Sequence, residues 1–147
     1  MILANISKLF DVQLQVLEKE VSAFDEKFLW AVAPGISNSA GNLALHLLGN
    51  LNTYIGAVLG KTSYIRNRED EFSLKNLPAA QLISMIAETR KMISQVLENV
   101  SESSLQEDYP VLVFENPQTT GYFLLHLCSH LSYHNGQINY LRRILEA

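Results

Sequence analysis

The 147-residue sequence has little cysteine, no long apolar run and no excess of positive charge. Its one cysteine, Cys128, excludes an internal disulfide, which suits a reducing compartment. No stretch reaches the roughly 18 apolar residues of a membrane span, and the N-terminus lacks the features of a signal peptide. The net charge of −4 provides little attraction for nucleic acid. We therefore expect a cytoplasmic protein with no nucleic-acid or membrane partner.

Helical periodicity runs through most of the chain. Apolar residues recur at steps of three and four, which predicts four helices at about residues 3–24, 39–60, 78–100 and 119–147. The stretches 62–76 and 109–120 lack this pattern and are interpreted as long connections. Because no alternating strand pattern occurs, the sequence predicts one all-α domain over residues 1–147, a four-helix bundle with long crossover connections.

Three of the four histidines, His126, His130 and His134, occur at intervals of four residues in the last predicted helix. Successive helical residues are rotated by about 100°, so these imidazoles share one face. A polar arc on the opposite side should face water, and we therefore expect the histidines to face the interior. That arc consists of Ser132, Asn135, Asn139 and Arg143.

The fourth histidine, His46, lies on a stripe of small and polar residues in the second predicted helix. The bulky apolar residues of this helix lie beside and behind the stripe. An inward stripe of this kind predicts a cavity rather than a packed seam. The stripe contains Ser39, Asn42, Gly49, Asn50, Thr53 and Ala57.

The histidine spacing is typical of metal ligands. Imidazoles four residues apart lie about 5–6 Å from each other at Cβ, and a third from a facing helix can complete a set of three. His126 and His134 are about 12 Å apart along the axis, which is too far for both to share an ion. The polar neighbours of His134 favour His130 with His134, and leave His126 as a core residue or a support for a ligand. If the second and last helices run parallel, His46 would instead lie level with His126.

Three segments carry a family resemblance. NSAGNLALHLLGNLNTYIGAVLG, YIRNREDEFS and LLHLCSHLSYHNGQINYLRRIL resemble the DinB/YfiT-like superfamily of small metal-binding four-helix proteins. The resemblance implies one metal ligand from the second helix and two from the last, which correspond to His46, His130 and His134. It also implies Ni²⁺ or Zn²⁺, often a homodimer, and transfer of a low-molecular-weight thiol such as bacillithiol or mycothiol.

Three histidine ligands leave a coordination position open, as in catalytic zinc sites. Cys128 lies on the far side of the last helix from His130 and cannot close the site. No carboxylate occupies either inward stripe, so the general base of metal-dependent peptidases is missing from the helices. The sequence therefore favours a metal-dependent thiol transferase with a small-molecule substrate. A hydrolase that uses metal-bound water, and a non-enzymatic metal-binding or stress-response protein, are the alternatives; no catalytic side chain is assigned.

The charged segment between the second and third predicted helices has three interpretations. Arg66 and Arg68 could hold an anionic substrate, the acidic residues at 69–71 could supply the missing carboxylate, or the whole segment could be a solvated loop. Asn50 and Gln137 each lie one turn from a proposed ligand, where they would hydrogen-bond to the site or serve as ordinary interior polar residues.

One apolar patch is predicted on the outer side of the last helix, where it could meet a partner copy in a homodimer. It consists of Leu124, Leu125 and Cys128.

Overall fold

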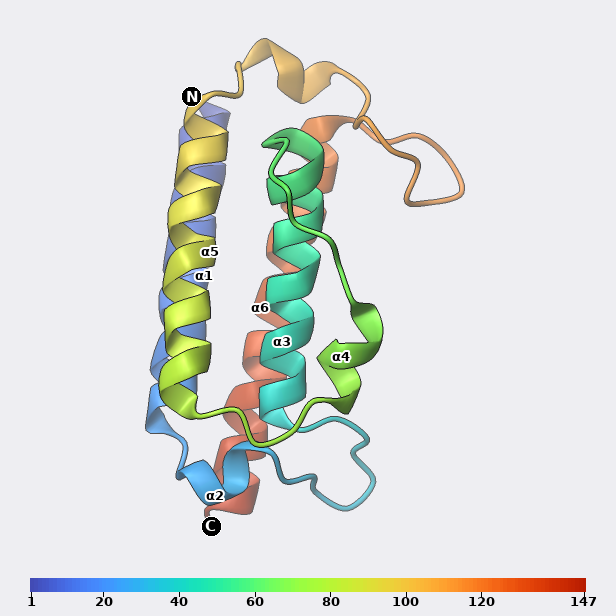
Figure 1. Cartoon of the computed structure of the whole chain (residues 1–147). Coiled ribbons are helices and arrows are strands. Elements are labelled where there is room, and N and C mark those ends of the chain that lie inside the picture. Colours follow the sequence, from blue (N-terminus) through green and yellow to red (C-terminus); the bar gives the residue numbers. More distant parts are fainter.

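The computed structural model describes residues 1–147 and consists of helices and connections (Figure 1). The four long helical segments are α1 (Ile2–Ala23), α3 (Ala40–Leu51) with its π-helical continuation η1 (Asn52–Leu59), α5 (Ala79–Glu98) and α6 (Thr120–Leu145). The short helices are α2 (Glu26–Leu29), α4 (Arg68–Ser73) and the 3₁₀ helix η2 (Ser103–Gln106). A single isolated bridge, Asp108 with Thr119, is the nearest approach to a strand pair. The predicted all-α four-helix bundle with long crossovers is confirmed.

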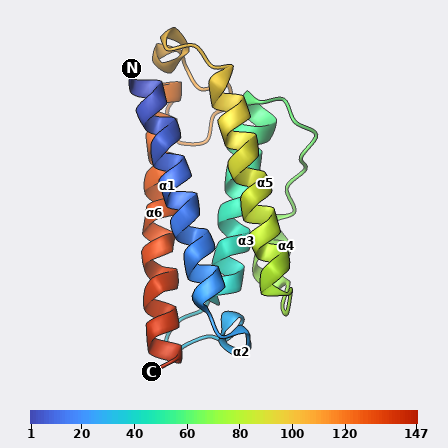
Figure 2. The same ribbon diagram turned by 90° about the vertical axis from the view of Figure 1, so that its left-hand side faces the viewer.

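The long helices form a square bundle. α1 packs against α5 and α6, and α3 packs against the same two helices from the other side. Figures 1 and 2 show that α1 and α6 run in one direction and that α3 and α5 run in the other. The connection from α3 to α5 therefore returns along the length of the bundle, and it places α4 against α3.

Side-chain caps define where two of the helices begin. Ser39 Oγ accepts a hydrogen bond from the backbone N–H of Asn42 at the start of α3, and Thr119 Oγ1 accepts one from Tyr122 at the start of α6. Each satisfies an N–H group that has no partner within its helix. None of the helices combines the length with the apolar character needed to cross a bilayer.

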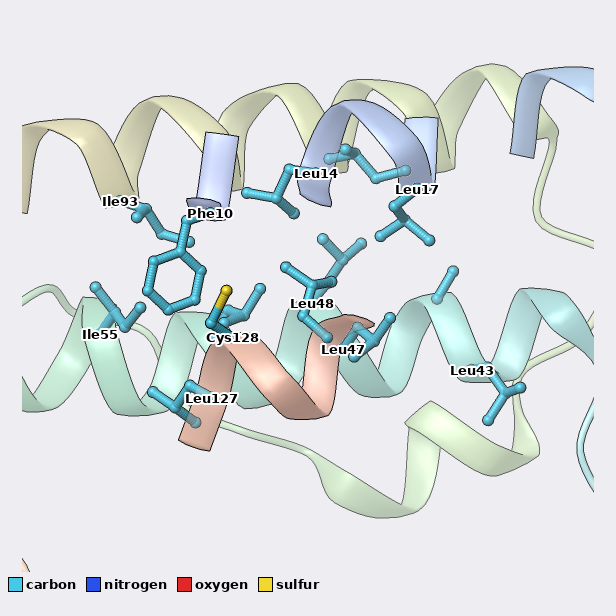
Figure 3. Close-up of a cluster of buried hydrophobic side chains, with 14 of the residues drawn as sticks. Phe10, Leu14, Leu17, Leu43, Leu47, Leu48, Ile55, Ile93, Leu127 and Cys128 are labelled. Carbon is cyan, nitrogen blue, oxygen red and sulfur yellow. The ribbon is translucent and has the colours of Figure 1, made fainter. Parts of the chain in front are cut away.

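The core lies along the axis of the bundle and draws apolar side chains from all four long helices (Figure 3). It includes Cys128 and Leu124, which are 8% and 0% exposed. The predicted partner patch on α6 is therefore wrong, because only Leu125 of its three members is exposed. Burial also raises the pKa of the Cys128 thiol, which keeps it protonated.

The rotation of α6 also differs from the sequence prediction. Asn135 is only 3% exposed and donates to the backbone oxygen of Gln13, 2.8 Å away, while Asn139 donates to Glu20. Asn135 and Asn139 of the predicted polar arc therefore face α1, whereas Ser132 and Arg143 are exposed as predicted. The histidines consequently lie at the edge of the core: His130 and His134 are half-buried, and His126 is exposed.

Candidate metal centre

Three histidines from two antiparallel helices meet beside the core. His46 comes from α3, and His130 and His134 come from successive turns of α6. His130 Nε2 lies 3.2 Å from His46 Nε2 and 3.1 Å from His134 Nε2. One ligand atom from each residue lies within 4.8 Å of the other two. The alternative grouping of His46 with His126 does not form, because α3 and α6 run in opposite directions.

These separations fit a shared ion. Two nitrogens bound at about 2.1 Å, at octahedral or tetrahedral angles, are roughly 3.0–3.4 Å apart. Both nearest Nε2–Nε2 distances in the cluster fall in that interval. The three imidazoles can therefore take up a divalent cation with little rearrangement.

The outer nitrogens of two imidazoles are held by oxygen atoms. Glu71 Oε1 lies 3.0 Å from His46 Nδ1, and Gln137 Oε1 lies 2.7 Å from His134 Nδ1. These oxygens accept hydrogen bonds, so each Nδ1 carries the proton and each Nε2 presents its lone pair to the centre of the cluster. Two lone pairs therefore point toward His130 Nε2, whose single proton can satisfy only one of them.

His130 also lacks a hydrogen-bond partner at its other ring nitrogen. Its Nδ1 is buried and has no hydrogen-bond partner. An additional proton could relieve the crowding of lone pairs, but burial and the charges of His134 and His46 lower the pKa of His130 to about 4. Burial likewise lowers the pKa of His46, against the opposing effect of Glu71. At neutral pH the imidazoles of His46 and His130 are therefore uncharged, which is the form that binds metal ions.

Glu71 reaches His46 because α4 packs against α3. Its side chain is 5% exposed, and Arg66 holds it with two hydrogen bonds, from Nε to Oε2 at 2.7 Å and from Nη2 to Oε1 at 2.8 Å. Gly49 makes room for it, because a Cβ atom at this position would collide with the carboxylate. The small stripe of α3 that predicts a cavity is thus covered at Gly49 by an acidic side chain from a distant segment.

The charged segment supplies a carboxylate to the surroundings of the cluster, but not at the open position where the sequence interpretation placed one. The carboxylate meets the outer nitrogen of His46 rather than the face where the three Nε2 atoms converge. Sequence reasoning missed the pairing of Glu71 with Gly49, and its one signal was a glycine inside a helix, three residues after His46. Arg68 begins α4 and is exposed, without a contact to the histidines.

Of the remaining predicted site residues, only Gln137 contacts a clustered histidine. Gln137 holds His134, as described above, whereas the buried Oδ1 of Asn50 has no partner and makes no hydrogen bond to a histidine. His126, predicted as a core residue or a support for a ligand, is not in the core and makes no hydrogen bond to a clustered histidine. It is exposed and packs against Phe114 and Phe123, with ring centroids 4.9 and 5.9 Å away.

Two aromatic side chains border the cluster. The ring of Phe72, from α4, lies 5.2 Å from that of His46, and the ring of Tyr133 lies 5.3 Å from that of His134. Tyr133 is 65% exposed and His134 is half-buried, so this edge of the cluster lies near the protein surface. A small molecule that approached the histidines from here would meet aromatic surfaces rather than free charges.

Comparison with known proteins extends these observations. A sequence model of the family described as mycothiol-S-transferase matches residues 5–147. The crystal structure of a DinB-like protein from Bacillus cereus superposes with a TM-score of 0.69 and 20% sequence identity, over 91% of this chain and 86% of that one. At this identity the likeness is one of fold. No curated protein matches the sequence at a significant level.

Proposed function

The chain belongs to the mycothiol-S-transferase family, and on this premise we propose that it joins a low-molecular-weight thiol to an electrophile at a metal ion. We propose Ni²⁺ or Zn²⁺ as the ion and His46, His130 and His134 as its ligands. The observation that carries the proposal is the convergence of three Nε2 atoms, two of them with lone pairs directed by Glu71 and Gln137.

The donor set suits an ion that remains open to one further ligand. Three neutral nitrogens provide three positions and no fourth protein group closes the set, since Cys128 is buried in the core away from the cluster. When bound there, a divalent ion supplies Lewis acidity that favours the thiolate form of a thiol. A protein base is then unnecessary for activating the nucleophile.

The side chains around the histidines act by holding them in place. Glu71 keeps the proton of His46 on Nδ1, and Arg66 fixes the carboxylate through both of its oxygens. Gln137 does the same for His134 from the next turn of α6. Such hydrogen bonds orient the rings and raise the basicity of the ligating nitrogens.

The same contacts weigh against the hydrolase alternative. A hydrolase that activates metal-bound water is assisted by a carboxylate base beside the ion, as in the HExxH enzymes. Glu71 is the one carboxylate that contacts the cluster, and both of its oxygens are engaged on the outer side of His46. Thiol transfer does not need this base and is therefore the better-supported chemistry.

The proposal extends to the nature and location of the substrates. Mycothiol and bacillithiol are the thiols to test, with a small apolar or aromatic electrophile that suits the surfaces of Phe72 and Tyr133. We place the protein in the cytoplasm, where low-molecular-weight thiols remain reduced. Formation of a homodimer now rests on the family resemblance alone.

A thiol-dependence assay tests this function. The full chain, purified without a polyhistidine tag and loaded with Ni²⁺ or Zn²⁺, is mixed with monochlorobimane and with mycothiol, bacillithiol or no thiol. We expect conjugation above the uncatalysed rate only when thiol and metal are both present, and loss of that excess after chelation. Turnover of the electrophile without thiol, or an unchanged rate in the chelated protein, would overturn the proposal.

A further inference from the structure

A cavity of about 450 Å³ lies between α3, α4 and α5, apart from the histidine cluster. None of the three clustered histidines lines it. Figure 2 shows α4 and the segments on either side of it beside α5, and these segments contribute Tyr64, Ile65, Asn67 and Leu74 to the lining. The volume lies within the range of about 300–1,000 Å³ that is usual for small-molecule sites.

The charged groups in its wall are all acidic. Asp70, Glu71 and Glu88 line the cavity, and no lysine, arginine or histidine does. Arg66 neutralises Glu71 from outside the lining, whereas neither Asp70 nor Glu88 forms an ion pair. Glu88 is exposed, and Asp70 Oδ2 accepts one hydrogen bond from Asn67 Nδ2 at 2.8 Å. The cavity therefore retains two carboxylates without a counter-ion, which a cationic ligand could neutralise.

A neutral acceptor accompanies these carboxylates. Asn52 also lines the cavity, and its side-chain N–H groups donate to Thr89 Oγ1 at 2.8 Å and to the backbone oxygen of Leu48 at 2.9 Å. The carbonyl oxygen of the Asn52 side chain is left free to accept a hydrogen bond. The bond to Thr89 joins η1 to α5 within the lining of the cavity.

The rest of the wall is largely apolar. Leu45 and Leu48 contribute from α3, Met85 and Met92 from α5, and Leu74 from the segment after α4. Methionine side chains adapt to irregular shapes and make favourable contacts with aromatic rings. This part of the cavity would accommodate the hydrocarbon portion of a ligand whose charged end met the acidic groups.

We propose that this cavity is a second small-molecule site, which takes a primary ammonium ion carried on an apolar or aromatic body. The ammonium group is attracted to the acidic part of the wall at Asp70 and Glu88, and the body packs against Met85 and Met92. The site shares Glu71 with the surroundings of the histidine cluster, but it contains none of the three histidines and requires no metal ion.

The methionines themselves provide the measurement. The chain has three, and Met1 lies outside the cavity. We would label the methionine methyl groups of the full chain, assign them with Met85→Leu and Met92→Leu, and titrate with phenethylamine by NMR. Saturable shifts of the Met85 and Met92 signals, with Met1 unchanged, are expected. Phenethyl alcohol, which replaces the ammonium with a hydroxyl, should bind about tenfold more weakly.

Matched variants connect the binding to the acidic wall. Glu88→Gln should weaken phenethylamine binding about five- to tenfold, whereas Glu98→Gln, on the same helix but outside the lining, should leave it unchanged. His134→Ala should bind the amine normally, so the cavity and the proposed thiol chemistry can fail independently. Absence of saturable shifts at Met85 and Met92, equal binding of amine and alcohol, or normal binding by Glu88→Gln would overturn the proposal.

Discussion

Helix α6 packs against α1 on one side, the α1 seam, and against α3 on the other, the α3 seam. The polar groups of these two seams are arranged in opposite ways. In the α1 seam, Glu20 accepts hydrogen bonds from Asn139 Nδ2 at 2.8 Å and from Arg142 Nε at 3.0 Å. In the α3 seam, the lone pairs of His46 and His134 converge on the nitrogen of a third imidazole. The first arrangement pairs donors with acceptors, whereas the second brings acceptors together.

This difference separates a structural polar seam from one prepared for a ligand. A buried polar group without a partner is destabilising by about 1–3 kcal/mol, so acceptors gathered at one point need a cation to compensate them. The carboxylate of Glu20 is matched by donors within the protein, although the buried Oδ1 of Asn135 in the same seam has no partner. The carboxylate of Glu71, in contrast, lies behind His46 and accepts a hydrogen bond from its Nδ1. It thereby directs the Nε2 lone pair of His46 into the cluster. Similar residue types therefore stabilise one seam and prepare the other for metal binding.

The largest effect is expected when a nitrogen is removed from the α3 seam. His134→Ala should reduce the metal content from about one ion per chain to almost none, because two remaining imidazoles make a weak site. Elemental analysis of protein purified without a polyhistidine tag measures this directly. His126→Ala is the matched control, since it removes an exposed histidine from the same helix. Equal metal content in the parent and His134→Ala would exclude His134 from the site.

A smaller loss is expected when the hydrogen bond behind a ligand is weakened. Glu71→Gln removes the charge that fixes His46 and leaves Arg66 without its partner, so the metal affinity should fall about 10- to 100-fold. Competition with a chromophoric chelator gives the affinity. Glu69→Gln changes an exposed carboxylate on the same short helix and should have no effect. If both variants bind metal as tightly as the parent, Glu71 serves only to dock α4.

The sequence predicted the long helices and the histidines of the α3 seam, but not the polar contacts of the α1 seam. Steps of three and four are sufficient to predict the long helices, and a spacing of four residues places His130 beside His134. The family resemblance added His46. The direction of α3 relative to α6, which makes that grouping possible, depends on the course of two connections that carry no periodic signal.

Two further features depended on contacts between distant parts of the chain. Asn135 and Asn139 have the pattern of a solvent-facing arc, and only their partners on α1 show that they face the interior of the bundle. The six-residue helix α4 is too short for helical periodicity to identify, and the role of Glu71 depends on its docking at Gly49. Sequence analysis thus identified residues that could bind metal, but not the residues that orient them.

The α1 seam should respond in stability rather than in metal binding. Glu20→Gln removes the counter-ion of Arg142, so the free energy of unfolding should fall by about 1–2 kcal/mol. Chemical denaturation of the metal-free protein measures the change, with Glu18→Gln on the same helix as a control that forms no ion pair. Metal affinity should remain that of the parent. A clear loss of metal affinity in Glu20→Gln would show that the two seams are coupled through α6.

The smallest effect distinguishes two helical glycines, one in each helix of the histidine cluster. Gly136 lies on α6, and a Cβ atom there would meet no other atom within 4 Å, so Gly136→Ala should stabilise the protein by about 0.5–1 kcal/mol. The same substitution at Gly49 would displace the Glu71 carboxylate and should weaken metal binding. Thermal unfolding and metal titration of both variants test the contrast. If Gly49→Ala also raised stability and bound metal normally, α4 would not need the space at Gly49, and the orientation of His46 would not depend on the docked carboxylate.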